Sequence, residues 1–394
     1  MSRLLLIGSW LPAPEACGLW LAACSLWLAA LYMILIGFFT YGWYRGRKSS
    51  VFSLQSSVVP GKVPVSLVVS ARDEEKFIGD LLDDLTRQDY QEDLTEIIIV
   101  DDKSIDNTYK IIEDFMQVNN SSKIILLKTE EFNVSGKKAA IDLAVRRATG
   151  EIILTTDADC KVGPGWITAM VNSFKDEKIR MVAGPVSYLP VKGFWNEFQS
   201  IEFASLIASG AGAAGAGHPF LCNGAGLAYR KEAFMQVGGF SGNEQYLSGD
   251  DVFLLHKVKK AFGRRSVVFC HGEKAIVKTF PAEGFRKFIS QRVRWASKSR
   301  AYSDPLSIFT ALIVFSYSLT VLSSFISGFF NPWFFLLSGG MLVLKMITDF
   351  PLLWGVTGFF RHRRLLRWYP VFQVIYPFYI AYAGLLSLFK RRLW

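Results

Sequence analysis

Cysteine and histidine are scarce in this sequence, and their spacing does not suit a metal site. The 394 residues include five cysteines and four histidines. The cysteines lack the short spacing of a zinc site, and two of them, Cys17 and Cys24, lie in a long apolar segment. His218 and His271 have no metal-ligand partners at a useful spacing, so we expect both to be structural or to line a pocket. A reduced, cytosolic main domain fits this use of cysteine.

The positive net charge of +10 is not accompanied by a recognisable nucleic-acid-binding motif. The basic residues gather beside apolar segments. Arg45, Arg47 and Lys48 follow the first such segment, and residues 361–367 between the last two hold four arginines. The positive-inside rule and anionic lipid surfaces produce clusters at such positions. We therefore expect membrane lipids as partners and no nucleic acid.

Two nucleotide-binding signatures are missing or out of context. A sugar-nucleotidyltransferase would need a Gly-rich phosphate loop near its N-terminus, and the sequence has none there. Residues 210–215, Gly-Ala-Gly-Ala-Ala-Gly, match a dinucleotide-binding fingerprint by letter. They follow a helical stretch at 197–209 and not a strand. We expect a flexible or tightly packed segment near the acceptor.

Apolar residues make up 51% of the chain and are concentrated in four long segments. Residues 17–39 and 306–330 carry no charge and exceed the ~20 residues that cross a bilayer. Residues 333–355 and 370–389 have similar lengths. The predicted organisation is a transmembrane anchor (1–45), a linker (46–62), a water-soluble domain ending in an amphipathic interface helix (63–300) and a C-terminal membrane region (301–394).

The last membrane segments leave two questions open. If the N-terminus is outside, the main domain is cytosolic, and a full last crossing would place the basic residues 390–392 outside, against the positive-inside rule. Pro377 interrupts this segment, so a re-entrant or interfacial helix is the alternative. Lys345 and Asp349 are four residues apart and can pair on a helix. Such a pair either stabilises the anchor or belongs to a substrate path.

The middle of the chain alternates between strand and helix patterns. β-Branched runs predict strands at 63–70, 96–100, 124–127 and 151–155, and helical periodicity occupies 76–88, 107–118 and 137–148. This alternation predicts an α/β fold with a mainly parallel, Rossmann-like sheet. Ligands of such sheets bind outside the carboxyl ends of the strands. The acidic clusters of this chain fall at those ends.

The first two strands are each followed by carboxylates. Residues 70–75, Ser-Ala-Arg-Asp-Glu-Glu, can hold a nucleotide base and ribose, although a solvated helix cap is the favoured explanation when this motif is taken alone. Asp101 and Asp102 end the second strand. Their oxygens can accept hydrogen bonds from a base N–H or ribose hydroxyls, and the alternative is an Asp-rich turn.

Two more acidic pairs have catalytic potential. Asp157 and Asp159 follow the fourth strand and point the same way along an extended chain, so both can bind one divalent cation. We expect Mg²⁺ or Mn²⁺, which would neutralise charge on a nucleoside-diphosphate leaving group. Asp250 and Asp251 precede a helical run. A carboxylate there can remove the proton of an acceptor hydroxyl, and the alternative is a helix N-cap.

Residues 291–295, Gln-Arg-Val-Arg-Trp, lie on an amphipathic stretch just before the second membrane segment. Arginine and glutamine side chains can bind a diphosphate, and an indole face can stack on a sugar or acceptor. A juxtamembrane basic and aromatic belt would also place Trp and Arg here, but it would not explain their order.

Taken in order, these motifs resemble the inverting family-two glycosyltransferases of the GT-A fold. The resemblance is strongest to membrane members such as bacterial polysaccharide synthases and ceramide glucosyltransferases, and it covers about residues 64–295. It rests on residues 70–75, the Asp101-Asp102 pair, the Asp157-Ala158-Asp159 triplet, residues 249–251 and the Gln-x-x-Arg-Trp pattern at 291–295.

The resemblance implies a role for each matching residue. Those expected around the nucleotide are Ala71, Arg72, Glu74, Asp101, Asp102 and Lys137. Asp157 and Asp159 would bind the metal, with Asp159 in direct contact, and Asp251 beside Asp250 would be the general base. Gln291 and Arg294 would bind the diphosphate. The residues expected at the acceptor are Trp295, Cys222, Asn223 and Gly224.

The implied reaction is inverting transfer from a nucleoside-diphosphate sugar, with UDP favoured, to a lipid or lipid-linked acceptor. Gly249-Asp250 replaces the Thr-Glu of many relatives, and residues 220–224 match the acceptor segment of processive members only loosely. Both departures weigh against the alternative, a processive polysaccharide synthase. A non-catalytic membrane-anchored subunit is an alternative of another class. We expect an integral protein of a bacterial inner membrane, and the sequence leaves its oligomeric state open.

Overall fold

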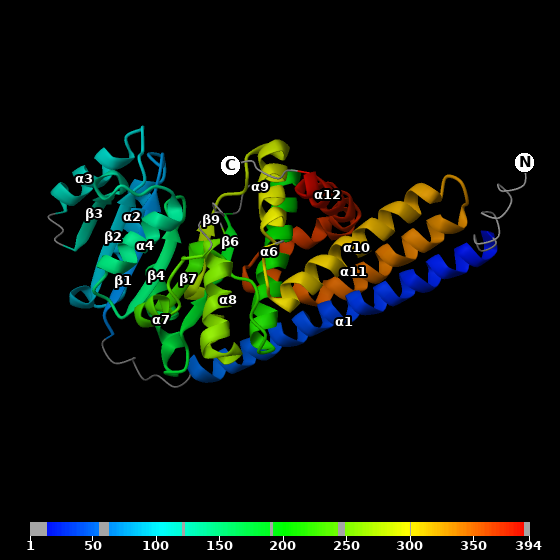
Figure 1. Ribbon diagram of the computed structural model, residues 1–394, viewed down its shortest axis with the longest axis horizontal. Coiled ribbons are helices and arrows are strands. Elements are labelled where there is room, and N and C mark those ends of the chain that lie inside the picture. Colours follow the sequence, from blue (N-terminus) through cyan, green and yellow to red (C-terminus); the bar gives the residue numbers. More distant parts are fainter. Residues whose placement is uncertain are drawn as a thin grey trace, which may run out of the picture.

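The computed structural model describes residues 14–54, 63–119, 123–189, 192–242, 249–299 and 301–389. The chain has a globular α/β part and an elongated bundle of long helices that extends away from it (Figure 1). Two helices stand between these parts, across the direction of the bundle. The predicted α/β class is confirmed, and the predicted apolar segments form helices that are long enough to cross a membrane.

The α/β part is built on a seven-stranded sheet with the order β3-β2-β1-β4-β7-β5-β8. Its strands are β1 (Val65–Ala71), β2 (Thr95–Asp101), β3 (Ile124–Lys128), β4 (Ile152–Asp157), β5 (Met181–Ala183), β7 (Leu227–Arg230) and β8 (Val267–Phe269). The first four run parallel, whereas β7 is antiparallel to both β4 and β5. The sheet is therefore mixed but mainly parallel, as the GT-A fold requires.

Both faces of this sheet are covered by helices, which explains the continuous apolar runs of its strands. Leu67 of β1 packs in one core with α2 (Ile78–Thr86) and α3 (Thr108–Val118), while its neighbour Val68 packs in a second core with α4 (Lys137–Arg147) and α8 (Asp250–Phe262). Alternate residues of a strand point to opposite faces, so each strand contributes to both cores. The remaining short elements are α5 (Trp166–Val171), α7 (Lys231–Gln236) and a parallel pair, β6 (Val186–Tyr188) with β9 (Val277–Thr279).

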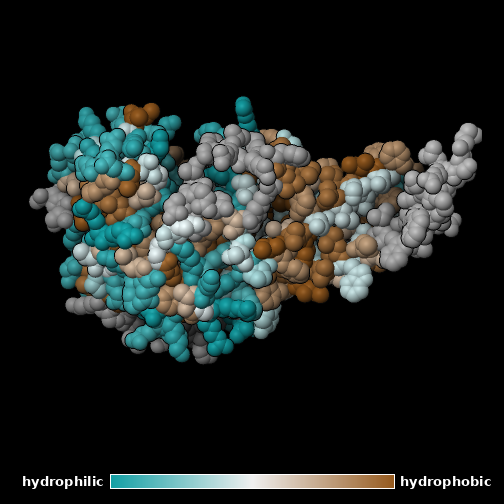
Figure 2. Space-filling model, viewed as in Figure 1, coloured by the Kyte–Doolittle hydropathy of each residue, from teal (hydrophilic) through white to brown (hydrophobic). Residues whose placement is uncertain are grey.

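Within the described residues, four helices are long and apolar enough to cross a membrane: α1 (Pro14–Leu54), α10 (Pro305–Ser327), α11 (Trp333–Phe359) and α12 (Tyr369–Phe389). Their exposed surface is largely hydrophobic, in contrast to the hydrophilic surface of the α/β part (Figure 2). Helix α1 continues to Leu54, so the first part of the expected linker is helical. In Figure 1, α1, α10 and α11 run together, whereas α12 is seen almost end-on and crosses them steeply.

The helices between the two parts are α6 (Phe194–Gly215) and α9 (Gly284–Ser299). Helix α6 crosses α1 at glycines. A Cβ at Gly42 would lie 1.8 Å from the carbonyl oxygen of Gly212, and a Cβ at Gly212 would lie 2.2 Å from the carbonyl oxygen of Phe39. The Gly-rich residues 210–215 are thus the last turns of a helix and are tightly packed, which also rules out a strand-to-helix dinucleotide loop.

The basic segment between α11 and α12 contacts the α/β part. Arg361 binds Glu273 at 2.7 Å, and Arg367 binds Glu197 at 2.9 Å. The segment 361–367 therefore lies on the same side of the bundle as the main domain, as the charge pattern predicts. Inside the bundle, Lys345 and Asp349 do form the expected pair, at 2.5 Å.

Candidate active site

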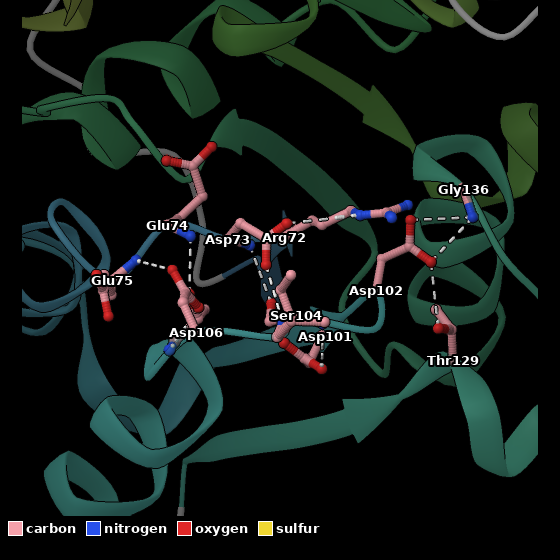
Figure 3. Close-up of polar contacts among 12 residues, drawn as sticks. Arg72, Asp73, Glu74, Glu75, Asp101, Asp102, Ser104, Asp106, Thr129 and Gly136 are labelled. Carbon is pink, nitrogen blue, oxygen red and sulfur yellow. Dashed lines mark hydrogen bonds and ion pairs between the residues drawn. The ribbon is translucent and has the colours of Figure 1, made fainter. Parts of the chain in front are cut away.

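The loops after β1 and β2 are joined by hydrogen bonds at the carboxyl edge of the sheet (Figure 3). Oδ1 of Asp73 accepts from the amide of Ile105 at 2.9 Å, and the amide of Glu75 donates to Asp106 at 3.1 Å. Asp73 adopts a left-handed backbone conformation with φ of 56°. In Figure 3 the Glu74 carboxylate points away from these contacts, whereas the Arg72 side chain extends toward Asp102, with its Nε 3.9 Å from Oδ2 of Asp73.

Asp101 and Asp102 are both buried but have different surroundings. Both oxygens of Asp102 accept from the amide of Gly136, at 2.9 and 3.0 Å, and one also accepts from Thr129. This carboxylate therefore fixes the loop that starts α4. Oδ1 of Asp101 has no hydrogen-bond partner among the described residues. A buried carboxylate oxygen without a partner is costly, so Asp101 is the better of the two to accept a base N–H.

The start of α4 brings a cation to the end of β4. Lys137 follows Gly136 directly, and its ammonium group binds Asp157. Burial alone would lower the pKa of Lys137, but Asp157 and Asp250 raise it, so the side chain stays charged. Asp102, through Gly136, thus positions the lysine that the sequence had linked to the donor.

The Asp157–Asp159 region has more negative charge than Lys137 can offset. Burial and the neighbouring Asp157 raise the pKa of Asp159. Burial, together with Asp159 and Asp157, raises the pKa of Glu74 to about 7. Among the described residues, no group of three or more carboxylate, histidine or cysteine side chains surrounds a metal position. A cation fits this charge, and it would need phosphate oxygens and water as its other ligands.

Asp251 lies in the first turn of α8 and meets the predicted acceptor segment. Its Oδ2 accepts from the amide of Gly224 at 2.9 Å, and its Oδ1 accepts from the amide of Val252 at 2.8 Å. Burial and then Asp250 raise the pKa of Asp251, which makes it a stronger base than an exposed aspartate. Thr155 of β4 donates to the carbonyl oxygen of Gly224 at 2.9 Å and so connects this group to the Asp157 region.

These predicted residues line one small pocket. It has a volume of about 20 Å³, and its walls include Lys137, Asp157, Gly224, Asp250 and Asp251. Segments that are far apart in the sequence therefore meet here. The sequence predicts that this set of residues carries donor, metal and base functions, and the structure places them within one site.

Helix α9 divides the Gln-x-x-Arg-Trp pattern between two faces. Arg292, which the pattern does not specify, is buried and binds Glu202 through three hydrogen bonds, two of them at 3.0 and 3.1 Å. Its guanidinium also lies 4.3 Å from the ring centre of Trp295. Arg294 is exposed, and Gln291 accepts a hydrogen bond from Arg292. Arg292 therefore holds Trp295 in place, while Arg294 is free to reach a ligand.

Lys298, one turn beyond Arg294, is a residue that the sequence interpretation missed. A Cβ at Gly249 would lie 3.1 Å from Cδ of Lys298, so the lysine packs over the residue before Asp250. Burial lowers the pKa of Lys298 to about 8, opposed by Asp251 and assisted by Arg294. The spacing Gln291, Arg294, Lys298 follows one face of a helix, and this periodicity is the signal that would have found it.

The two histidines considered in the sequence are structural. His218 contacts Nη1 of Arg264 at 3.2 Å and lies edge-on to Phe38. His271 is buried against Trp43 and Phe269, and neither ring nitrogen has a hydrogen-bond partner among the described residues. Burial and then Arg47 lower its pKa to about 3, which keeps the ring neutral.

Comparison with known proteins gives independent evidence of the family that part of this chain resembles. Residues 66–238 match the family model Glycosyl transferase family 2. Over 194 residues the chain is 27% identical to a beta-monoglucosyldiacylglycerol synthase of Nostoc sp., covering 49% of this chain and 41% of that protein. Over 144 residues it is 29% identical to a poly-beta-1,6-N-acetyl-D-glucosamine synthase of Staphylococcus epidermidis, covering 36% and 33%. The chain thus spans less than half the length of these relatives.

Among solved structures, the chain is similar to a mannosyltransferase from Pyrobaculum calidifontis in complex with GDP-Man and Mn²⁺. The TM-score is 0.57 and the identity 19%, over 94% of this chain and 100% of the other. At this identity the likeness establishes the shared GT-A fold.

Proposed function

We propose that this chain, in which residues 66–238 match the glycosyltransferase family 2 model, is a glycosyltransferase that moves a sugar from a nucleoside-diphosphate sugar to a membrane lipid. Transfer occurs by one displacement with inversion, so an α-linked donor gives a β-linked product. The observation that carries the proposal is the meeting of Lys137, Asp157 and Asp251 around one pocket beside the acceptor segment at Gly224.

The donor nucleotide binds at the carboxyl ends of β1 and β2. Asp101 accepts hydrogen bonds from the base or ribose, and Ala71, Arg72 and Glu74 complete this part of the site. Asp102 acts indirectly, because its carboxylate is occupied by Gly136 and Thr129. A UDP-sugar is the favoured donor.

Asp157 and Asp159 would hold a divalent cation, either Mg²⁺ or Mn²⁺, together with the donor's phosphate oxygens. The raised pKa values of Glu74 and Asp159 support a cation here, because they reflect carboxylates crowded into a half-buried space. When bound, such a cation supplies positive charge to the departing diphosphate. Arg294, Lys298 and Lys137 add fixed positive charge around the same group, and Gln291 adds a hydrogen-bonding amide.

Asp251 removes the proton of the acceptor hydroxyl. Its Oδ2 is oriented by the Gly224 amide, and burial raises its pKa, which improves a carboxylate as a general base. Trp295 and residues Cys222, Asn223 and Gly224 surround the acceptor. Asp250, buried beside Asp251, raises the pKa of the base through its negative charge.

The four apolar helices anchor the enzyme in a membrane, which we propose is a bacterial inner membrane with the catalytic part on the cytosolic side. The cation-rich segment 361–367 on the domain side of the bundle supports this orientation. Because α12 crosses the other three helices steeply, we place it at the membrane interface, which keeps both of its ends on the cytosolic side (Figure 1).

The decisive experiment is a panel of nucleoside-diphosphate sugars incubated with the purified chain and a membrane lipid extract, with products identified by mass spectrometry. A single sugar on a lipid is expected. A long polymer would favour the processive alternative, and the absence of any donor cleavage would favour a non-catalytic subunit.

A further inference from the structure

A large apolar cavity of about 470 Å³ lies between the catalytic part and the membrane helices. Its walls come from α6 and α9 on one side and from α1, α10, α11 and α12 on the other. Phe198, Ile201, Leu352 and Phe372 are typical of its lining. Ligand sites in proteins have volumes of roughly 300–1,000 Å³ and mainly apolar walls, so both size and lining suit a small molecule.

One end of this cavity reaches the residues proposed for catalysis. Leu221 lines it and directly precedes the segment Cys222–Gly224, whose last amide binds Asp251. Trp295 and Tyr302 also line the cavity. Tyr302 lies close to α8, with its ring centre 5.4 Å from that of Phe253, and Asp251 is among the groups whose charge acts on its hydroxyl.

The other side of the cavity opens between α10 and α12. Leu312 of α10 and Leu388 of α12 both line the cavity, yet they are 60% and 50% exposed. Both helices belong to the apolar surface that would face hydrocarbon. A molecule in the bilayer can therefore enter sideways, without first passing through water.

The positive and negative charges in the cavity lining are equal in number. They are two carboxylates, Glu202 and Asp349, and two cations, Arg292 and Lys345. Arg292 binds Glu202, which also accepts from Tyr379 at 2.9 Å. Lys345 binds Asp349 and Gln373, each at 2.5 Å, and Asp349 accepts from Tyr32 at 2.8 Å. No cation of the lining is left to pair with a buried phosphate, and an unpaired charge in such a place is costly.

We propose that this cavity holds the hydrocarbon of an uncharged lipid alcohol, whose hydroxyl reaches Asp251 beside Leu221, Trp295 and Tyr302. The inference rests on the proposed function and narrows its acceptor from a membrane lipid in general to an uncharged lipid alcohol. A general base also fits an alcohol better than a lipid phosphate. A phosphate oxygen is already ionised near neutral pH, and it would be repelled by Asp250 and Asp251.

In the resulting step the acceptor oxygen forms a bond to the anomeric carbon of the sugar. The bond from that carbon to the diphosphate breaks, and the nucleoside diphosphate leaves with the electron pair. The hydroxyl proton passes to the carboxylate of Asp251. The lipid needs no charge of its own for this reaction.

The test uses the full chain in nanodiscs, with the donor that the panel identifies. Two acceptors that differ by one phosphate group are compared, diacylglycerol and phosphatidic acid with the same acyl chains. Sugar transfer to lipid and hydrolysis of the donor by water are measured separately. We expect transfer to diacylglycerol and none to phosphatidic acid. Transfer to phosphatidic acid or to a prenyl phosphate, without transfer to diacylglycerol, would overturn the inference.

A matched pair of variants tests the route of entry. Leu312→Trp enlarges a residue at the opening, and Leu319→Trp makes the same change seven residues along α10, at a position that is 40% exposed and does not line the cavity. Leu312→Trp should raise the KM for diacylglycerol about tenfold, with donor hydrolysis unchanged, and Leu319→Trp should change neither. Equal KM values in the two variants would refute the cavity as the acceptor site. If the wild-type chain hydrolyses none of the donors, the proposed function itself is wrong, and the inference fails with it.

Discussion

The amide of Gly224 donates a hydrogen bond of 2.9 Å to Oδ2 of Asp251, which joins the segment before β7 to the first turn of α8. Gly224 also accepts from Thr155, two residues before Asp157. The carbonyl and the amide of one glycine therefore connect the proposed metal site to the proposed base. This arrangement fixes the distance between the two groups that a single-displacement transfer must coordinate.

We predict that Asp251→Asn abolishes transfer while nucleotide binding survives. The amide keeps one oxygen, which can accept from Gly224 or from Val252 but not from both, and it cannot take a proton from the acceptor. General-base catalysis contributes about 10²- to 10⁴-fold, so turnover should fall by a factor of that size. Release of nucleoside diphosphate measures turnover, and isothermal titration measures nucleotide binding.

Asp142→Asn is a suitable control for this variant. Asp142 lies on α4, where it pairs with Arg146 at 2.6 Å, and it is outside the pocket that contains Asp251. Its turnover should stay near that of the wild type. Near-normal turnover in Asp251→Asn would show that another group is the base.

Removal of divalent cations should stop the reaction, because Asp157, Asp159 and Glu74 form an excess of negative charge that would repel a diphosphate. EDTA should abolish transfer, and added Mn²⁺ or Mg²⁺ should restore it. Asp159→Asn should require a higher cation concentration for half-maximal rate than the wild type. Full activity in chelator would refute the metal role of this pair.

Loss of the Lys298 proton should reduce kcat/KM for the donor at alkaline pH. Its pKa of about 8 means that the ammonium group loses its proton as the pH rises through 8, and with it the charge available to the diphosphate. The value of kcat/KM for the donor should therefore decline above this pH, since that ratio reports groups of the free enzyme.

Lys298→Arg distinguishes this explanation from others, because a guanidinium stays protonated far above pH 8. In that variant the decline should move to higher pH. An unchanged alkaline limit would exclude Lys298 as its source.

The sequence predicted those parts of the fold that are marked by long, regular patterns. Strands β1 to β4 have five to seven residues and are rich in Ile, Val and Leu, and each was expected within about two residues of its observed bounds. Strands β5 to β9 have only three or four residues, which is too short for a periodic signal.

The candidate site was predictable to the extent that parallel strands share an edge. Asp101 and Asp157 end the two strands that flank β1, and the register aligns Ala71 of β1 with Asp101 and Ser70 with Asp157. The internal role of Asp102 was not predictable, because it depends on where the Gly136 loop returns. The contrast between Arg292 and Arg294 likewise depends on which face of α9 packs against Glu202.

The Lys345–Asp349 pair should stabilise the membrane part as a unit. Lys345→Met would leave the Asp349 carboxylate buried without a cation, which costs about 3–5 kcal/mol. The double variant Lys345→Met/Asp349→Asn removes both charges and keeps one oxygen, which can accept from Tyr32, whereas the Gln373 amide loses its acceptor on residue 349. It should recover much of the thermal midpoint measured in nanodiscs. Equal losses in the single and double variants would show that charge balance is not the cause.

His271 should make the docking of α1 on the catalytic part sensitive to acid. Its ring packs edge-on against Trp43 at 5.3 Å, and Gly46 lies so close that a Cβ there would be 2.6 Å from Nε2. The pKa of His271 is about 3 in the folded chain and 6.5 when exposed. Between these values the unfolded state binds a proton that the folded state does not, so the stabilisation is complete above pH 6.5 and is lost as the pH falls toward 3.

Each pH unit below 6.5 should therefore reduce the free energy of unfolding by about 1.4 kcal/mol from this residue alone. His271→Phe keeps an aromatic ring against Trp43 and Phe269 but cannot take up the proton. Thermal midpoints in nanodiscs, measured from pH 7.5 to 5, should decline more steeply for the wild type than for the variant, whatever their difference at pH 7.5. Parallel slopes would mean that protonation of His271 does not open this contact, and that the acid sensitivity of the fold lies in its carboxylates.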